Sequence, residues 1–365
     1  FDHLVVDPEF YDAWAQRIAA GDWLGDRTFY LDPLYPYFLG VLYAAFGRSL
    51  LLVRLVQVGL SLGACTAVGV LGRRLGGRRV GLYAAGSFAL YKPEIFYVGE
   101  IEKTSLSICL TTFALLFTCG NRRLEWFLAG ATLGLASLTR ANLLLLVPFA
   151  CLAFLFVSAS RRSQRGVVAS ALFVAGLALT LFPVAWRNHR VSGEWVLTTS
   201  QAGQNLYIGN NPTNPSGAYG LLPFVRPNPH FEEIDFRAEA ERRVGHGLTA
   251  SEVSAFWLWE TVRHVREHPG FAAAVLLRKL ALFWNDFEIS DNQDQYLLAR
   301  QSWVMALPLL GFGVVAPLAA VGAFFAAARS WRARILLGFV GLYWISVALF
   351  FLFSRYRIQV IAALL

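Results

Sequence analysis

Apolar segments follow one another along most of this chain and are separated by short stretches in which charged residues gather. Six of them are candidates to cross about 30 Å of hydrocarbon as helices, at 49–72, 80–98, 104–119, 166–186, 302–328 and 335–353. Two shorter segments, 126–139 and 141–158, flank Arg140. Because an arginine at the centre of a bilayer is costly, we expect two short helices that meet at Arg140 near the membrane surface.

The composition agrees with this pattern. Of the 365 residues, 56% are hydrophobic and only 15% are charged, so the bilayer is the main solvent for the chain. All four cysteines fall within the apolar segments or at their ends, where we interpret them as small core residues rather than disulfides or metal ligands, at positions 65, 109, 119 and 151.

The positive charge is concentrated in short loops between the apolar segments. The net charge is +8, and the loop arginines are Arg73, Arg74, Arg78 and Arg79, then Arg122 and Arg123, then Arg161, Arg162 and Arg165, then Arg329, Arg332 and Arg334. This distribution is typical of loops that stay in the cytoplasm, so it indicates orientation in a membrane and not a nucleic-acid partner.

Placing these loops in the cytoplasm puts the longer polar segments on the outer side, namely 1–48, 91–103, Arg140, 187–301 and 354–357. We expect Phe271 to Phe287 to lie along the outer surface as an interfacial helix with Trp284 at headgroup level, because another crossing would break the alternation. Pro follows Asn211 and Asn214, so neither begins an N-glycosylation signal, and a bacterial inner membrane is the simpler location.

The expected fold is an all-α membrane protein, a multi-pass helix bundle with outer-face loops and a small extracytoplasmic lobe that contains α and β structure. We divide it into an N-terminal membrane module at 1–186, an outer loop and lobe at 187–301, and C-terminal membrane helices at 302–365. The chain starts at Phe1 without Met, and Leu365 lies within an apolar run. We therefore expect a span before the first residue and a helix beyond the last.

Sequence signals also predict elements on the outer side. Tyr11 to Ala20 forms an amphipathic helix closed by Gly21, and a second short helix starts at Asp32-Pro33. In the lobe, Glu194 to Ile208 carries β-forming residues, while Glu232 to Val244 is a polar helix candidate. A further helix starts at the capping box of Thr249 to Glu252 and ends at Pro269-Gly270.

Charged residues at the outer helix ends are the candidates for chemistry. Asp7, with Glu9 beside it, precedes an aromatic-rich helix, and a carboxylate there could deprotonate an acceptor hydroxyl. Acids at a helix start also suit the positive end of its dipole, so Asp7 has a purely structural explanation as well. Glu100, Glu102 and Lys103 could orient an acceptor or contact phosphate, or form a solvated loop.

Three arginines lie at outer helix ends and could bind the phosphate of a lipid through paired donors, or act as snorkelling anchors; they are Arg140, Arg355 and Arg357. Glu260, His264 and His268 share a helix face without a His-Glu-x-x-His pattern, which disfavours a metal site. No phosphate-binding glycine loop is present, so nothing indicates nucleotide use or another cofactor, although a divalent metal stays an open alternative.

Several segments together resemble one family, the polytopic GT-C glycosyltransferases, specifically the bacterial group related to dolichyl-phosphate-mannose protein mannosyltransferases and the lipid A aminoarabinose transferase. The resemblance rests on Asp7 to Trp23, Asp32-Pro33-Leu34-Tyr35-Pro36-Tyr37, Gly134 to Arg140, Asn205 to Asn211 and Ser354-Arg355-Tyr356-Arg357. It implies an inverting sugar transfer from a polyprenyl-monophosphate donor, with the catalytic aspartate in the first outer loop, which falls on Asp7. Relatives often have Lys or His where this chain has Asp32, and Lys103 could take over that contact.

We therefore expect a glycosyltransferase that moves a sugar from a polyprenyl-phosphate donor to a protein, lipid or glycan acceptor at the outer face of the membrane. Asp7 is the candidate base, and the candidate substrate-binding residues are Glu9, Asp32, Tyr35, Glu100, Glu102, Lys103, Arg140, Arg355, Tyr356 and Arg357. The alternatives are a glycan polymerase or ligase that uses a polyprenyl-diphosphate oligosaccharide, and a flippase. Spans with few charges at their centres disfavour the flippase.

Overall fold

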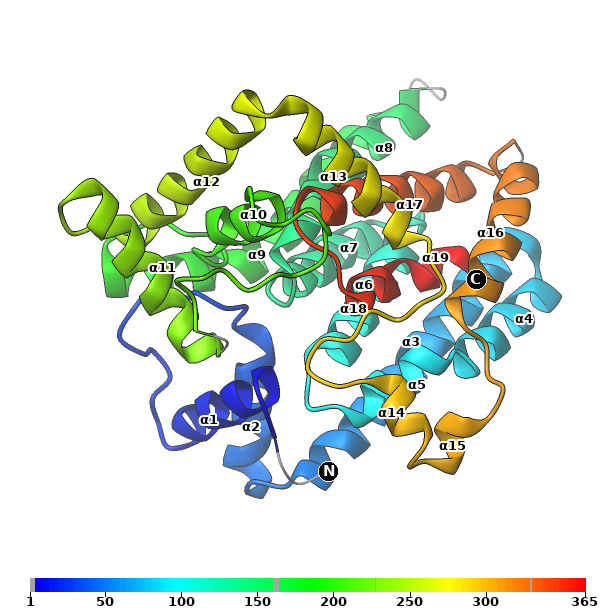
Figure 1. Ribbon diagram of the computed structural model, residues 1–365. Coiled ribbons are helices and arrows are strands. Elements are labelled where there is room, and N and C mark those ends of the chain that lie inside the picture. Colours follow the sequence, from blue (N-terminus) through cyan, green and yellow to red (C-terminus); the bar gives the residue numbers. More distant parts are fainter. Residues whose placement is uncertain (1–3, 160–163, 227, 329) are drawn as a thin grey trace.

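The computed structural model describes residues 4–159, 164–226, 228–328 and 330–365, and the elements in these ranges are helices joined by loops (Figure 1). β-Structure in the described ranges is confined to two isolated bridges, Tyr91 with Leu310 and Ala218 with Leu352. The expected all-α membrane fold is therefore found, but the expectation of β structure in the outer lobe was wrong.

The N-terminal part consists of α1 (Asp7–Ala19) and α2 (Leu34–Phe46), which pack tightly against each other. A Cβ added at Gly40 on α2 would lie 2.6 Å from Cγ2 of Ile18 on α1, so the two helices meet where one residue has no side chain. The rings of Tyr11 and Tyr35 pack edge to face with centroids 5.5 Å apart. This contact holds the start of α1 at a defined place.

Among the described residues, three helices are long and apolar enough to cross a membrane: α3 (Leu50–Gly76), α9 (Arg165–Ser192) and α17 (Trp331–Leu349). Shorter helices accompany them, namely α4 (Arg78–Ala89), α6 (Thr104–Thr118), α7 (Arg123–Ser137), α8 (Val147–Ala159) and α16 (Phe312–Ala327). As expected, Arg140 lies at a break, between α7 and the 3-10 turn η1 (Ala141–Leu146) that leads into α8.

Helices α7 and α9 approach closely because glycines face each other across their contact. A Cβ at Gly130 would lie 1.8 Å from the carbonyl oxygen of Phe173, and one at Gly176 would lie 2.1 Å from that of Phe127. Gly130 and Gly134 form a Gly-x-x-x-Gly pair, the spacing that lets membrane helices pack backbone to backbone.

Two expected spans are divided. The segment 80–98 forms α4 and then α5 (Lys92–Gly99). Pro93 has no backbone N–H to donate to the carbonyl of Ala89 and its ring would clash there, so one continuous helix is disfavoured and the chain breaks at Tyr91. The segment 302–328 forms α15 (Trp303–Ala306) and then α16, with Leu307 extended before Pro308. The backbone N–H of Lys92 donates to the carbonyl of Leu310 at 2.9 Å, which ties the two breaks together.

The lobe is formed by α10 (Ala202–Asn210), α11 (Pro229–Val244), α12 (Ala250–Glu267) and α13 (Pro269–Phe283). The β-forming stretch 194–208 ends in α10 because tertiary packing outweighs its propensity: Tyr207 packs on the fully buried Trp257, with ring centroids 4.6 Å apart. The capping box at Thr249 and the break before Pro269 are confirmed.

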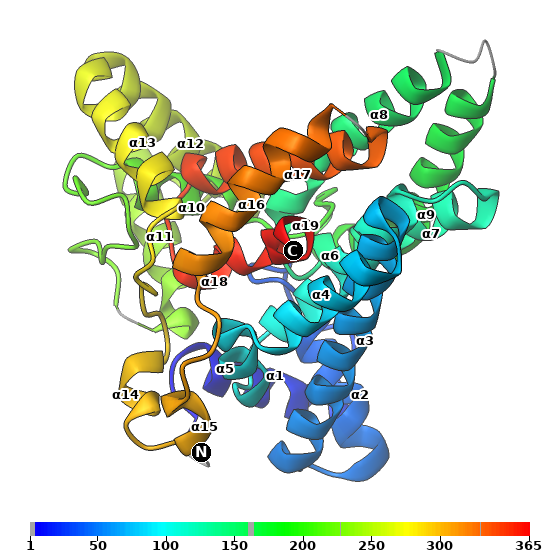
Figure 2. The same ribbon diagram turned by 90° about the vertical axis from the view of Figure 1, so that its right-hand side faces the viewer.

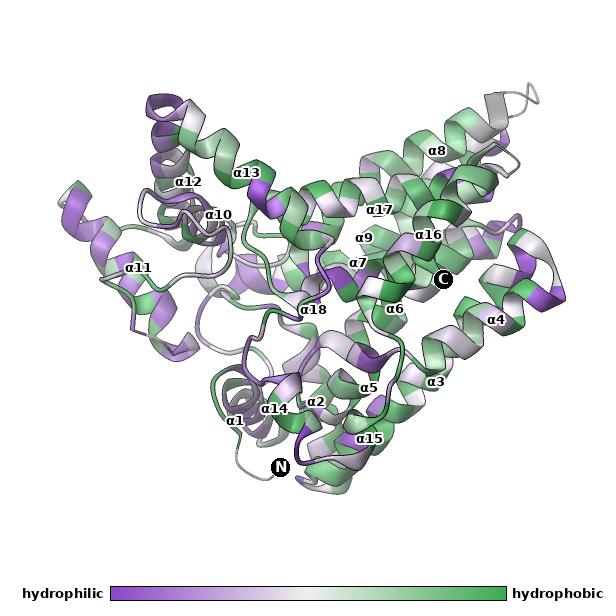
Figure 3. Cartoon of the chain, turned by 45° about the vertical axis from the view of Figure 1, so that its right-hand side comes forward, coloured by the Kyte–Doolittle hydropathy of each residue, from purple (hydrophilic) through white to green (hydrophobic). Residues whose placement is uncertain are grey.

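The C-terminal loops complete the described structure with α14 (Gln295–Ala299), α18 (Ser354–Arg357), the 3-10 turn η2 (Ile358–Val360) and α19 (Ile361–Leu364). In Figure 3 the apolar helices lie on one side, and the polar helices α11 and α12 project at the other. The ends at which α3 meets α4 and α16 meets α17 lie far from α11 and α12, as Figure 2 also shows. The chain thus separates an apolar body from a polar lobe.

Candidate functional site

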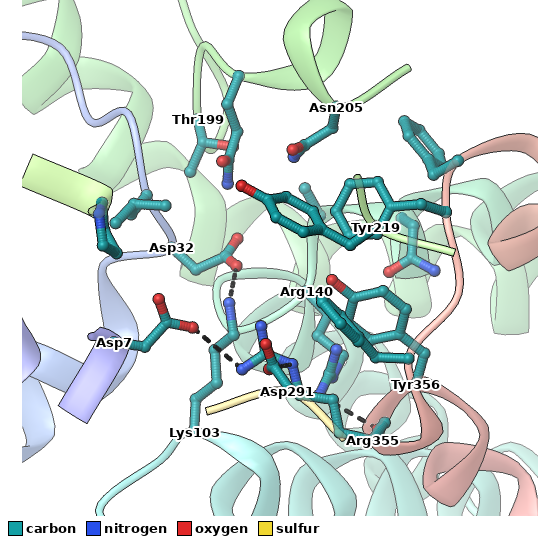
Figure 4. Close-up of a pocket in the computed structure, with 18 of the residues that line it drawn as sticks. Asp7, Asp32, Lys103, Arg140, Thr199, Asn205, Tyr219, Asp291, Arg355 and Tyr356 are labelled. Atoms are coloured by element: carbon teal, nitrogen blue, oxygen red, sulfur yellow. Dashed lines mark hydrogen bonds and ion pairs between the residues drawn. The ribbon is translucent and has the colours of Figure 1, made fainter. Parts of the chain in front are cut away.

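A cavity of about 880 Å³ lies where the start of α1, the lobe and the C-terminal loops meet. Six residues singled out from the sequence line it: Asp7, Asp32, Lys103, Arg140, Arg355 and Tyr356. Figure 4 shows the charged ones gathered on one side of the space, which we call the charged floor, with Thr199 and Asn205 on the opposite side. Part of the lining is apolar, with Leu144, Leu145 and Val347. Residues that lie far apart in the sequence therefore form one polar site beside an apolar surface.

Asp7 reaches the cavity from the first residue of α1. Pro8 suits the first turn of the helix, where a backbone N–H has no partner. Val6 before it has a φ of 56°, a left-handed conformation that is costly for a β-branched residue and that often marks a functional turn. Oδ2 of Asp7 accepts a hydrogen bond from Nη1 of Arg355 at 3.1 Å. Its Oδ1 makes no hydrogen bond to any described residue.

Arg355, at the start of α18, is shared among three carboxylates. Its Nη1 also donates to Oε1 of Glu102 at 2.9 Å, and its Nε lies 2.7 Å from Oδ2 of Asp291. Burial raises the pKa of Asp291, while Arg355 opposes that rise. Burial also tends to raise the pKa of Glu102. The positive charges of Arg355 and Arg140 outweigh this effect and hold the pKa of Glu102 below its ordinary value. This charge network positions Asp7 and brings Nη1 and Nε of Arg355 close to carboxylates.

Asp32 and Lys103 form a second buried ion pair in the floor. Nζ of Lys103 lies 2.6 Å from Oδ2 of Asp32, and both side chains are less than a tenth exposed. Oδ1 of Asp32 is buried and has no hydrogen-bond partner in the described part of the chain. Lys103 therefore lies beside position 32, and its replacement of the basic residue that relatives often have there stays a prediction.

Arg140 differs from the other cations of the floor because no carboxylate within 4.0 Å pairs with it among the described residues. Its Nη2 donates to Oγ1 of Thr104 and to the carbonyl of Arg355, both at 3.3 Å, and its guanidinium lies 4.8 Å from the ring centre of Tyr356. Nε is buried without a hydrogen-bond partner in the same ranges. A buried guanidinium with only neutral partners retains donors for an anionic ligand.

The remaining predicted residues lie outside the cavity lining. Glu9 is exposed, and the hydroxyl of the fully buried Tyr35 donates to Oε1 of Gln57 at 2.7 Å. Glu100 and Glu102 lie behind the floor. Arg357 pairs with Glu288 at 2.7 Å and donates to the carbonyl of Phe287 and to Asn285. These contacts give Arg357 and Tyr35 packing roles in the structure.

Sequence reasoning missed the residues that the lobe and its connections contribute. Asp291, Glu232, Thr199, Asn205 and Tyr219 all line the cavity. Four of them lie in loops or in a polar helix, where hydrophobic periodicity does not single them out. The run Ser290-Asp291-Asn292, which follows an apolar helix on the outer side, is the signal that could have drawn attention to Asp291.

Metal ligation has no support in the geometry. In the ranges that the structure describes, no group of three or more His, Cys, Asp or Glu side chains is placed to hold a metal ion. His264 and His268 on α12 have ring centroids 4.9 Å apart, and neither lines the cavity. The four cysteines are free, and Cys109 and Cys119 are buried. The cavity lining itself contains four carboxylates, three cations and neutral polar groups, and the carboxylates are those of Asp7, Asp32, Glu232 and Asp291.

Comparison with known proteins relates the first half of the chain to a family. Residues 31–186 match the family described as dolichyl-phosphate-mannose-protein mannosyltransferase. The archaeal oligosaccharyltransferase AglB from Archaeoglobus fulgidus, solved with an inhibitory peptide and a dolichol-phosphate, aligns over 98% of this chain and 46% of its own, with a TM-score of 0.53 and 15% identity. ArnT from Cupriavidus metallidurans, solved with undecaprenyl phosphate, aligns over 99% and 73%, with a TM-score of 0.43 and 16% identity. No curated protein matches the chain in sequence.

Proposed function

We propose, from the relation of residues 31–186 to the dolichyl-phosphate-mannose-protein mannosyltransferase family, that this membrane protein is a glycosyltransferase with a polyprenyl-phosphate sugar donor. It transfers the sugar to a protein, lipid or glycan acceptor at the outer face of a bacterial inner membrane. The fold that it shares with AglB is consistent with this class, although the chain spans only 46% of that structure.

The observation that carries the proposal is Arg140. The guanidinium of Arg140 is buried, lines the cavity and makes no ion pair within 4.0 Å with a described carboxylate, so it can bind an anion that enters the cavity. A phosphate offers the oxygen atoms that a guanidinium binds best, and Lys103 lines the same floor. Leu144, Leu145 and Val347 form an apolar border beside it, which suits the start of a polyprenyl tail. Phosphate and apolar chain on one ligand match a lipid-linked donor.

Asp7 supplies the second element of the reaction. The hydroxyl oxygen of the acceptor attacks the anomeric carbon, and the new C–O bond forms as the bond to the phosphate oxygen breaks. The electron pair of the broken bond stays on the lipid phosphate, where Arg140 and Lys103 stabilise the charge. The hydroxyl proton passes to Oδ1 of Asp7, since Arg355 already occupies Oδ2. Attack opposite the leaving phosphate inverts the anomeric centre.

The experiment offers the purified protein in lipid nanodiscs two classes of donor together with a bacterial membrane extract as the acceptor source. One class comprises polyprenyl-monophosphate hexoses and pentoses, and the other is a polyprenyl-diphosphate oligosaccharide. Mass spectrometry of the lipids should show free polyprenyl monophosphate appearing from a member of the first class. Consumption of the diphosphate donor alone would instead establish the polymerase or ligase alternative.

A further inference from the structure

The side of the cavity opposite the charged floor consists of neutral polar side chains that lack internal partners. We call this surface the neutral wall and define it as Thr199, Gln201, Asn205 and Tyr219. None of these four side chains makes a hydrogen bond to another residue in the ranges that the structure describes. Gln201 is only 8% exposed. Thr199, Asn205 and Tyr219 are half-buried, so the amides and hydroxyls of the wall can give their free donors and acceptors to a ligand in the cavity.

Local packing holds the neutral wall in place. Gln201 is the N-cap residue of α10, and Asn205 lies in the first turns of that helix. A Cβ at Gly203 would be 1.8 Å from the carbonyl oxygen of Ser254, so α10 packs directly on α12. The ring of Tyr219 stacks on that of Phe353 with centroids 5.6 Å apart. These contacts position Gln201, Asn205 and Tyr219 along the cavity.

We propose that the neutral wall binds the hydroxyl groups of a carbohydrate, and that the acceptor of the reaction is therefore itself a sugar or a glycan. This inference rests on the proposed function, and it deepens that function by naming the class of acceptor. Each amide and hydroxyl of the wall can both donate and accept, as each sugar hydroxyl can. The aromatic ring of Tyr219, which lines the cavity, can pack against the C–H groups of a sugar ring.

The stereochemistry of the reaction assigns the wall to the acceptor. In an inverting transfer the nucleophile approaches the anomeric carbon from the side opposite the leaving phosphate. Arg140 and Lys103 hold that phosphate in the floor, and Figure 4 shows Thr199 and Asn205 across the cavity from them. A cavity of about 880 Å³ is near the upper end of the usual range for a ligand site, which leaves room for a donor head and a second sugar.

Glu232 fits the same interpretation. It lines the cavity, and its Oε1 accepts a hydrogen bond from the hydroxyl of Tyr30 at 2.8 Å. Burial raises the pKa of Glu232 to about 7, and the negative charge of Asp7 adds to this rise. The hydrogen bond from Tyr30 lowers the pKa, but by less. Below about pH 7 the carboxyl of Glu232 is mostly protonated and is then a further neutral group beside the wall. A peptide acceptor has less support, because the described part of the lobe has no strand edge on which an extended chain could pair.

The test compares ligand binding to the wild-type chain and to Asn205→Ala, both in nanodiscs, with Asn121→Ala as the control because Asn121 is exposed between α6 and α7. Saturation-transfer NMR uses methyl hexosides and N-acetylhexosaminides in one series and short peptides containing Ser and Thr in another. Native mass spectrometry measures the binding of undecaprenyl phosphate and of an undecaprenyl-phosphate hexose. Asn205→Ala should weaken binding of at least one glycoside about tenfold, while undecaprenyl phosphate binds all three proteins equally.

Three results would overturn this proposal while leaving the proposed function intact. The first is that the wild type and Asn205→Ala bind glycosides equally, and the second is that the protein binds peptides but no glycoside. The third is that Asn205→Ala loses affinity only for the undecaprenyl-phosphate hexose, which would assign the wall to the donor sugar. Failure of the wild-type chain to bind undecaprenyl phosphate would instead contradict the proposed function. Thr199→Val repeats the test with a substitution that keeps the shape of the side chain and removes only the hydroxyl.

Discussion

Two arginines in the charged floor have the same charge but different partners. Arg355 contacts Asp7, Glu102 and Asp291, whereas Arg140 contacts a hydroxyl, a carbonyl and the ring of Tyr356. Arg355 therefore positions the carboxylates, whereas Arg140 makes no ion pair with a described carboxylate and can bind an anion. Sequence alone could not separate these roles, because both arginines lie at outer helix ends and the acids that engage Arg355 come from three distant segments.

Arg140→Ala should weaken the binding of undecaprenyl phosphate by about 1.5–3 kcal/mol, the range for a hydrogen bond to a charged group, which is roughly 10- to 150-fold in Kd. Arg140→Lys should recover part of this loss, because an ammonium provides the charge without the paired donors. Native mass spectrometry of the protein in nanodiscs measures the affinity. Arg266→Ala on the exposed end of α12 is the control. Wild-type affinity in Arg140→Ala would exclude Arg140 as a phosphate ligand.

Glu232→Gln should change how stability depends on pH. The folded protein holds the proton of Glu232 up to about pH 7, whereas an unfolded chain loses it near pH 4.5. Between these values the folded state binds more protons, so this contribution to stability falls as the pH rises, by at most about 3 kcal/mol. Thermal unfolding in detergent at pH 5 and pH 8 measures it. The Tm of Glu232→Gln minus the Tm of the wild type should be larger at pH 8 than at pH 5. The same difference at both pH values would show that Glu232 does not hold the proton.

At the scale of elements, hydrophobic pattern and turn residues predicted most helices, and they failed where a contact distant in sequence decides the structure. The helices around Arg140, the capping box at Thr249 and the break before Pro269 follow from local signals, and the structure confirms them. The helix α10 does not, because Tyr207 becomes helical by packing on Trp257, which lies fifty positions further along the chain. Such a partner has no signature in the local sequence.

Close packing of α7 on α9 gives a prediction at this scale. Gly130→Ala should destabilise the protein by about 1–3 kcal/mol, because the added methyl group meets the backbone of Phe173 and forces the helices apart. Gly86→Ala on α4 is the matched control: no atom lies within 4 Å of the added group, and alanine favours a helix. Thermal unfolding of both variants in the same detergent is the measurement. Equal Tm values would show that α7 and α9 tolerate a wider separation.

At the scale of the whole molecule, the arginine-rich ends of the membrane helices and the polar lobe lie on opposite sides of the apolar body (Figure 3). The arginine pattern predicted this division from sequence alone. The cavity could not be predicted in the same way, because α1, the lobe and the loop before α18 meet only in the folded chain. What the sequence does contain is a set of charged residues at the outer ends of helices, and six residues expected there line the cavity.

The same charges predict the orientation of this arrangement in the membrane. Cysteines introduced in place of Arg79 and Arg123 should react with a membrane-impermeant maleimide only after the cytoplasmic side is opened, because arginine-rich loops stay inside. A cysteine in place of the exposed His246 should react in intact cells whose outer membrane is permeable. The unmodified chain gives the background from its own cysteines. The reverse pattern would place the cavity on the cytoplasmic side and remove it from an externally presented donor.

The most direct test of the account compares Asp7→Asn with the wild type in sugar transfer and in donor binding. Asparagine keeps the size of the side chain but cannot take the proton of the acceptor, so turnover should fall about 100-fold or more. The affinity for undecaprenyl phosphate should stay within about threefold of the wild type, because Arg140 and Lys103 remain in place. Turnover by Asp7→Asn at the wild-type rate, with the donor bound equally well, would contradict the assignment of Asp7 as the base.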